Sequence, residues 1–347
     1  MKNFQLNERL QNILIYVINE FIKTGQPVGS RTISKKYKLN LSPATIRNIM
    51  ADLEEMGLLT QPHTSAGRIP TKEGLKYYVD NLMGFSYIPE LIKNQIDSFI
   101  KNKEQNFENF FNDLSDLLSN LTNSIGVVVY PDLKKLKLKH IEFVKLNDTQ
   151  ILVVLVNELG HVENRIIEIE KNSISQMQLD KLSNFLNQKY SGKDLMEIKN
   201  EIINELKFLK SNFNAKISEI IDKFTKINWE EKTNKEVIVK GLNKIVDSEV
   251  LKSDFNQLKN FIKLFEEKSK LLEILEKTYK SPGIQIFIGN AIPYLEDMSI
   301  ITSTYSKGDT ILGSLGIIGP LRMNYQTIIP LVEYTSKLIS SLLEKQN

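Results

Sequence analysis

Three amphipathic helices are predicted in the first 60 residues. Apolar side chains recur at steps of three and four residues from Leu6 to Phe21, which is the spacing of one helix face. Ser30 and Ser42 each stand where a helix can begin, because a serine side chain can accept a hydrogen bond from a free backbone N–H. Pro43 fits the first helical position, where its missing N–H costs nothing. The pattern therefore predicts a long helix, a short helix after Ser30 and a third helix after Ser42.

The third predicted helix is followed by a hairpin-like segment. Gly57 is placed to close that helix, residues 58–60 resemble a short strand, and residues 61–70 form a turn-rich loop. A further helix begins near Thr71. Helix, short helix, tight turn, capped helix and hairpin-like loop are the order of a winged helix-turn-helix. On this order alone, a small helical domain that binds a protein remains the alternative.

The segment 88–123 is predicted to form one long amphipathic helix. Its apolar residues alternate at three- and four-residue steps, which fits either a coiled-coil seam between two chains or a helix lying on a sheet. The second arrangement is the commoner one.

Strand patterns occur in two separate parts of the chain, around a block that is mostly helical from 171 to about 280. Compact turns at 147–148 and 158–160 indicate antiparallel hairpins. One isolated strand candidate lies at 236–241, and a final helix is predicted at about 321–345. Strands, a helical block and strands again suggest one mixed domain interrupted by an insertion. The predicted strands are 124–130, 137–146, 149–157, 161–170, 284–290, 298–305 and 310–319.

Composition narrows the chemistry that is available. The sequence has no cysteine, so disulfides, a cysteine nucleophile and zinc–thiolate sites are excluded. Its three histidines stand far apart, which makes a histidine-rich metal site within one chain unexpected. No apolar run approaches the roughly 18 residues of a membrane span. The amino terminus lacks the apolar core of a secretory signal, and we expect a cytoplasmic protein without a cofactor.

Positive charge is concentrated at the amino-terminal end. Residues 1–84 contain eleven basic and seven acidic side chains, whereas the remainder contains 34 basic and 35 acidic ones. A basic module on a near-neutral body favours a polyanionic partner. A lysine-rich solvated surface explains the charge equally well, so the local pattern has to decide.

The local pattern favours duplex DNA. Arginine can pair with guanine and asparagine with adenine in the major groove, and the third helix carries Arg47 and Asn48 near its amino terminus. Ser42 and the start of the helix can hold a phosphate. The loop at 61–69 would be the wing, with Arg68 reaching a phosphate or the minor groove. The residues expected to contact DNA are Ser30, Arg31, Lys35, Lys36, Ser42, Ala44, Thr45, Arg47, Asn48, Thr64, Ser65 and Arg68.

Two stretches resemble a known family. PVGSRTISKKYKLNLSPATIRNIMADLEEMGLLTQPHTSAGRIPT, at 27–71, is similar to the amino-terminal domain of the HrcA family of bacterial heat-inducible transcription repressors. YSKGDTILGSLGIIGPLRMNY, at 305–325, resembles the family's second signature. The resemblance implies an α+β multidomain fold: a winged helix-turn-helix at 1–85, a GAF-like domain with an antiparallel sheet at 86–170 and 266–347, and an inserted, mostly helical dimerisation domain at 171–265.

The resemblance also implies a function. HrcA-like proteins bind the inverted repeat called CIRCE upstream of chaperone operons as homodimers, and the GroE chaperonin is thought to maintain them in the active form. The expected protein is therefore a negative regulator and not an enzyme. A metabolite-sensing regulator that uses the GAF-like pocket is the alternative. Gly313, Gly316 and Gly319 suggest a phosphate loop, but no Lys-Ser/Thr follows them, so tight strand packing explains them better.

Overall fold

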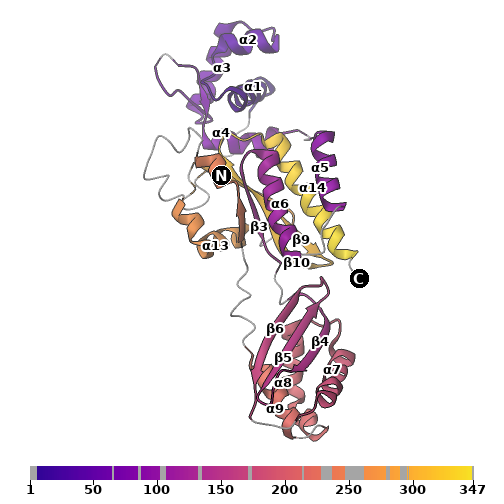
Figure 1. The fold of residues 1–347 in the computed structure, drawn as a ribbon. Coiled ribbons are helices and arrows are strands. Elements are labelled where there is room, and N and C mark those ends of the chain that lie inside the picture. Colours follow the sequence, from indigo (N-terminus) through magenta and orange to yellow (C-terminus); the bar gives the residue numbers. More distant parts are fainter. Residues whose placement is uncertain are drawn as a thin grey trace.

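Three bodies follow one another along the molecule: a head, a middle domain and a distal domain (Figure 1). The computed structural model describes residues 6–64, 66–84, 87–101, 107–131, 135–170, 174–212, 215–227, 237–246, 262–278, 282–289, 295 and 297–345. The α+β multidomain class predicted from the sequence is confirmed.

The head is a winged helix-turn-helix, as predicted. Its elements are α1 (Glu8–Thr24), α2 (Ser30–Tyr37), α3 (Pro43–Glu55), β1 (Leu59–Thr60), β2 (Ile69–Pro70), α4 (Lys72–Tyr77) and the π-helical turn η1 (Tyr78–Leu82). Asn7, Ser42 and Thr71 cap α1, α3 and α4 with their side chains. Strands β1 and β2 pair antiparallel and enclose the wing loop.

The middle domain is built on a five-stranded antiparallel sheet with the order β7-β3-β10-β9-β8. Its strands are β3 (Ile125–Val129), β7 (Val237–Lys240), β8 (Ile284–Ile288), β9 (Met298–Lys307) and β10 (Thr310–Pro320). Helices α6 (Phe107–Thr122) and α14 (Tyr325–Glu344) cover one face, and α5 (Glu90–Lys101) packs beside α14 (Figure 1). Helices α10 (Leu242–Val246) and α13 (Lys268–Thr278) lie on the other face.

The segment 88–123 is not one helix, which corrects the sequence prediction. The rings of Phe99 in α5 and Phe110 in α6 stack with their centroids 5.4 Å apart. In a single helix, eleven residues would separate them by roughly 16 Å along the axis. Helix α6 does lie on the sheet, where Phe111, Leu114 and Leu118 are fully buried. Its apolar face is used inside the chain, so the coiled-coil alternative has no support.

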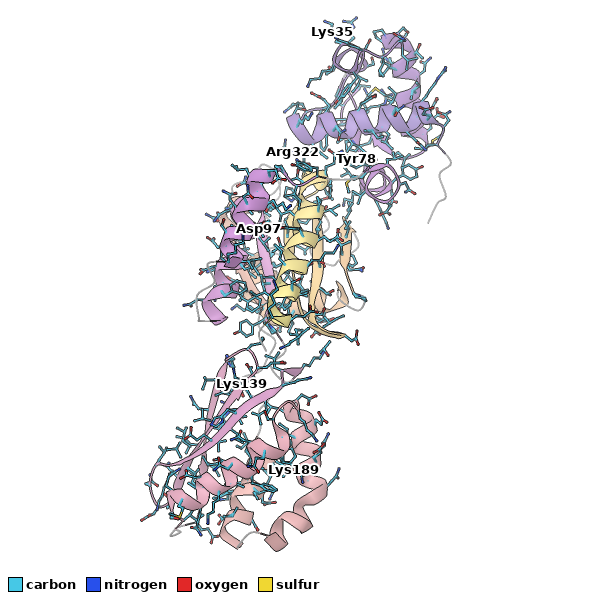
Figure 2. All side chains as sticks on the ribbon, turned by 90° about the vertical axis from the view of Figure 1, so that its right-hand side faces the viewer. Lys35, Tyr78, Asp97, Lys139, Lys189 and Arg322 are labelled. Carbon is cyan, nitrogen blue, oxygen red and sulfur yellow. The ribbon has the colours of Figure 1, made fainter. Side chains whose placement is uncertain are left out.

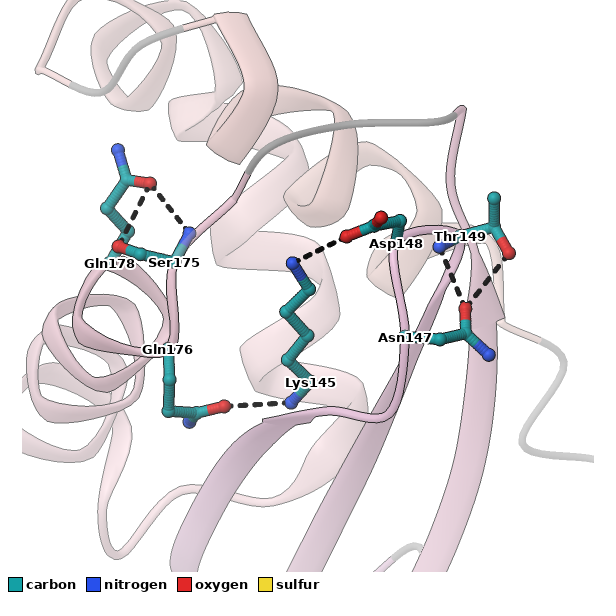
Figure 3. Close-up of polar contacts among 7 residues, drawn as sticks. All are labelled: Lys145, Asn147, Asp148, Thr149, Ser175, Gln176 and Gln178. Carbon is teal, nitrogen blue, oxygen red and sulfur yellow. Dashed lines mark hydrogen bonds and ion pairs between the residues drawn. The ribbon is translucent and has the colours of Figure 1, made fainter.

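The distal domain has its own sheet and its own core. The antiparallel strands β4 (Leu138–Lys145), β5 (Gln150–Asn157) and β6 (Val162–Glu168) pack on α7 (Gln176–Tyr190), α8 (Leu195–Asn212) and α9 (Ala215–Lys226). The predicted hairpins are confirmed. Figure 3 shows how α7 is held at the end of β4: the amide N–H of Lys145 donates to Gln176 Oε1 over 2.8 Å.

The sheet assignment made from the sequence was wrong at two places. Strands β4–β6 were assigned to the GAF-like sheet within 86–170, but they belong to the distal domain. Strand β7 was assigned to the insertion at 171–265, but it pairs with β3 in the middle sheet. The insertion is therefore a body that begins near residue 138 and ends near 227, and it contains a three-stranded sheet beside its helices. Hydrophobic periodicity identifies a strand, but it does not identify the strand's partner.

The glycines of β10 serve close packing, as predicted, and lie within a strand. A Cβ atom at Gly316 would stand 2.2 Å from the carbonyl oxygen of Ile301 on the neighbouring strand. A side chain at this position would push β9 and β10 apart.

Candidate nucleic-acid interface

Helix α3 presents a polar face to the solvent because its apolar residues anchor it from the other side. Ile46, Met50 and Leu53 are at most 1% exposed. The predicted contact residues Ala44, Thr45, Arg47 and Asn48 are all exposed. The helix therefore offers these four side chains, from its first two turns, to a partner outside the head.

The amino terminus of α3 is well defined. Ser42 Oγ accepts a hydrogen bond from the N–H of Thr45 over 3.1 Å and lies 2.9 Å from Thr45 Oγ1. Pro43 occupies the first turn, as predicted. Pro43 has no N–H, and the N–H of Ile46 donates to the carbonyl oxygen of Ser42. The N–H of Ala44 is therefore the one left in this exposed turn to contact a phosphate group.

Helix α2 supplies cations next to this face. Arg31 and Lys35 are exposed, and Ser30 at the start of the helix is half-buried. Figure 2 shows Lys35 at the outer end of the head and Lys189 in the distal domain, at the other end of the molecule.

Lys36 has a structural partner that the sequence did not reveal. Its ammonium nitrogen lies 2.6 and 2.7 Å from the two carboxylate oxygens of Glu20 on α1. The Glu20 side chain is only 6% exposed, whereas that of Lys36 is 54% exposed. Lys36 therefore neutralises a buried carboxylate, in addition to any contact with DNA. The available signal was Glu20 itself, an acidic residue next to the apolar stripe of α1.

Arg68 does not project from the wing as expected. Its Nε atom donates to Glu54 Oε2 over 2.9 Å, and its side chain is only 14% exposed. The guanidinium group thus ties the wing to the last turn of α3, and the expected phosphate or minor-groove contact has no support in this conformation. Thr64 is exposed at the tip of the wing. Ser65, the remaining wing residue expected to contact DNA, lies outside the described residues.

The base of the wing is fixed by backbone contacts. Val28 and Arg68 exchange two hydrogen bonds of 2.9 Å each. The side-chain amide of Gln61 donates to the carbonyl oxygens of Thr64 and Ala66. The wing is consequently held at a defined distance from α3, which a rigid DNA-reading surface requires.

The head joins the middle domain through a polar cluster around Tyr78. The Tyr78 hydroxyl donates to Asn19 Oδ1 over 3.2 Å and accepts from Gln326 Nε2 over 2.8 Å. Burial raises the pKa of Tyr78, which keeps this hydroxyl protonated and able to donate. Lys72 and Asp297 add an ion pair of 3.0 Å across the same junction. Helix α1, η1 and α14 are thereby linked.

Within the part of the chain that the structure describes, no group of three or more acidic or histidine side chains could hold a metal ion. Among the same residues, no helix has the length and apolar character needed to cross a membrane.

Comparisons with known proteins agree with this geometry. The family description "Winged helix-turn-helix transcription repressor, HrcA DNA-binding" matches residues 5–79, and "HrcA protein C terminal domain" matches residues 108–329. The heat-inducible transcription repressor HrcA of Syntrophobacter fumaroxidans is 39% identical over 343 residues, which cover 98% of each chain. The repressor of the same name from Nitrosomonas eutropha is 40% identical, over 97% of this chain and 99% of its own.

A solved structure shares the fold over the whole length. The crystal structure of a hypothetical protein at 2.2 Å resolution matches with a TM-score of 0.62 at 22% identity, over 99% of this chain and 100% of its own. The exposed helix α3, a wing and flanking cations, together with the matched family, define a winged-helix DNA-binding protein of the transcription-regulator class. The chain belongs to the HrcA family of heat-inducible transcription repressors.

Proposed function

We propose that this protein represses chaperone operons by binding the inverted repeat CIRCE as a homodimer in the cytoplasm, where its target DNA lies. The observation that carries the proposal is the exposed face of α3, with Thr45, Arg47 and Asn48 free to approach base edges. A two-fold dimer suits an inverted repeat, because each head can read one half-site.

The base-reading role of Arg47 can be tested by fluorescence anisotropy on a CIRCE duplex and a scrambled duplex. We expect Arg47→Ala to lose roughly 1–3 kcal/mol of binding on CIRCE and much less on the scrambled duplex. Arg47→Lys keeps the charge but loses the bidentate hydrogen bond, so it should bind the scrambled duplex like the parent and CIRCE more weakly than the parent. Lys35→Ala, in contrast, should weaken both duplexes alike. Equal losses on both duplexes for Arg47→Ala would contradict base reading by this residue.

The outer face of the distal sheet supports a dimer through the inserted domain. On β5, Leu152, Val154 and Val156 point away from the core, and Leu152 pairs with Ile166 on β6. Ile166 and Val162 are 55% and 53% exposed. An apolar sheet face of this kind is typical of a protein–protein interface.

Sedimentation velocity can test this dimer surface. We expect Ile166→Glu to shift the protein toward the monomer and to weaken CIRCE binding, because a buried charge would face its symmetry mate. Met177→Glu is the matched control, since Met177 is 69% exposed on α7 of the same domain. A dimer that survives Ile166→Glu unchanged would place the interface elsewhere.

Control by the GroE chaperonin is part of the same proposal. It is supported by the split middle domain, whose strand β3 must find partners far along the chain. Such non-local pairing is slow, and partly folded forms expose apolar surface that a chaperonin can bind.

A further inference from the structure

A cavity of about 510 Å³ lies in the middle domain, next to the head. It opens to solvent and is lined by the start of α5, the end of α6, helix α10 and the turn from β10 into α14. Its volume is within the range of sites that hold small ligands. Through Ile245 it adjoins the apolar core on the opposite face of the sheet near α13.

The lining of this cavity is divided by chemistry. Ile92, Leu121 and Ile328 contribute apolar surface, and hydroxyl and amide groups come from the turn between α6 and β3. Two cationic side chains, Lys244 and Arg322, also line it. Among the described residues that form the wall, none is acidic. This combination suits a molecule with an apolar body and a negative charge.

Arg322 connects the cavity with the head. Gly25 closes helix α1 with a φ of +71°, and a Cβ atom built on it would stand 2.5 Å from a terminal nitrogen of Arg322. The guanidinium group therefore lies against the carbonyl end of α1, where a positive charge is favourable. Figure 2 shows Arg322 at this junction. One side chain thus borders both the cavity and the DNA-binding domain.

The beginning of α14 adds to the positive potential of the cavity. Asn324, the residue before this helix, makes no side-chain capping bond, and no acidic residue stands in the first turn. Lys244 is held in place by a hydrogen bond of 2.6 Å from its ammonium group to Asn120 Oδ1. The amino-terminal end of the helix and the two cations therefore act on the same space.

We propose that this cavity binds a small organic anion with an apolar body, such as an aromatic carboxylate, and that the anion engages Arg322 and Lys244. The end of α1 carries only about half a negative charge, so a full anionic charge competes well for Arg322. Occupancy of the cavity would then loosen the contact between Arg322 and α1. The effect of this on repression rests on the proposed function, but binding of the anion does not.

Binding can be tested on the full chain by calorimetry at low ionic strength with 2-naphthoate. Two control compounds are measured in the same way: inorganic phosphate, which has a negative charge but no apolar ring, and 2-naphthalenemethanol, which has the ring but no charge. We expect one saturable 2-naphthoate site per chain, at least tenfold tighter than either control compound. Lys244→Met should weaken 2-naphthoate roughly tenfold or more, because a charge-assisted hydrogen bond is lost. Arg322→Met should have a similar effect.

Lys337→Met is the matched control, since Lys337 is exposed on α14 outside the cavity. Absence of saturable 2-naphthoate binding, or equal binding by the Lys244 and Arg322 variants, would overturn the proposal. Arg322→Met could weaken 2-naphthoate binding by displacing the head. Lys244→Met does not have this ambiguity, because Lys244 lies on α10 of the middle domain. CIRCE affinity is measured separately with the same samples. A chain that binds 2-naphthoate but not CIRCE supports the cavity site and contradicts the proposed function.

Discussion

Lys35 and Lys36 are neighbours on α2, but they have different environments. Lys36 pairs with the buried Glu20, whereas Lys35 is exposed at the outer end of the head. We expect Lys36→Met to lower the free energy of unfolding by roughly 1–3 kcal/mol, because the Glu20 carboxylate loses its counter-ion. Lys35→Met should leave stability within roughly 0.5 kcal/mol of the parent. Urea denaturation followed by circular dichroism measures both.

The double variant Glu20→Gln with Lys36→Met separates the ion pair from other effects. It should recover part of the lost stability, since no uncompensated charge stays buried. If Lys36→Met were as stable as Lys35→Met, the ion pair between Lys36 and Glu20 would contribute nothing to the free energy of unfolding. Lys35 is therefore a cleaner probe of phosphate contacts than Lys36.

Residue-scale prediction from the sequence succeeded for exposure and failed for pairing. The steps of three and four along α3 correctly placed Ile46 inside and Arg47 outside. The same steps could not show that Arg68 meets Glu54, because these residues lie on different elements. Periodicity describes one element at a time, and an ion pair depends on how two elements pack.

At the scale of elements, the wing depends on a close backbone approach. A Cβ atom on Gly67 would stand 2.4 Å from the carbonyl carbon and oxygen of Val28. We expect Gly67→Ala to force the wing away from the turn after α1 and to destabilise the protein by roughly 1–3 kcal/mol. CIRCE affinity should fall as well, because the wing shifts relative to α3. Thermal unfolding and anisotropy measure the two effects.

Gly84→Ala is the matched control for this prediction. A Cβ atom at Gly84 would meet nothing within 4 Å. The same chemical change should therefore leave stability and DNA binding nearly unchanged. A Gly67→Ala protein that behaves like Gly84→Ala would show that the wing adjusts without cost.

Elements near in sequence were predicted better than elements that meet over long distances. The hairpins of β4, β5 and β6 followed from their compact turns, and the helix-turn-helix order followed from its caps. The break between α5 and α6 was missed because the apolar stripe continues through both helices. An apolar stripe shows which face of a helix is buried. Two successive helices that pack on the same core can therefore have a continuous stripe, which hides the break between them.

At the scale of the whole molecule, the head and the middle domain share one core. Buried residues of the head, such as Leu14, belong to the same apolar cluster as Leu331 of α14, whereas Leu182 belongs to the core of the distal domain. We therefore expect two calorimetric unfolding transitions. Leu14→Ala and Leu331→Ala, each costing roughly 2–5 kcal/mol, should lower the same transition.

Leu182→Ala provides the comparison, because this side chain is fully buried in the distal core. It should lower only the other transition. A separate transition that responds to Leu14→Ala and not to Leu331→Ala would show that the head unfolds independently. Heat that melts the middle domain is otherwise expected to inactivate the head with it.

The shared core and the split sheet also set the order of events during protein synthesis. Ile125 of β3 pairs with Ile318 of β10, and Val129 pairs with Ser314, so roughly 190 residues separate the partners. At about 5–20 residues per second, a ribosome needs roughly 10–40 s to make that stretch. During this time the nascent chain carries β3 and α6 without β9 and β10, and β7 is the one strand of the middle sheet that can already pair with β3. The hydrogen bond from Gln326 to Tyr78 also cannot form earlier. The contact between the head and the middle domain is therefore completed only after α14 has been translated.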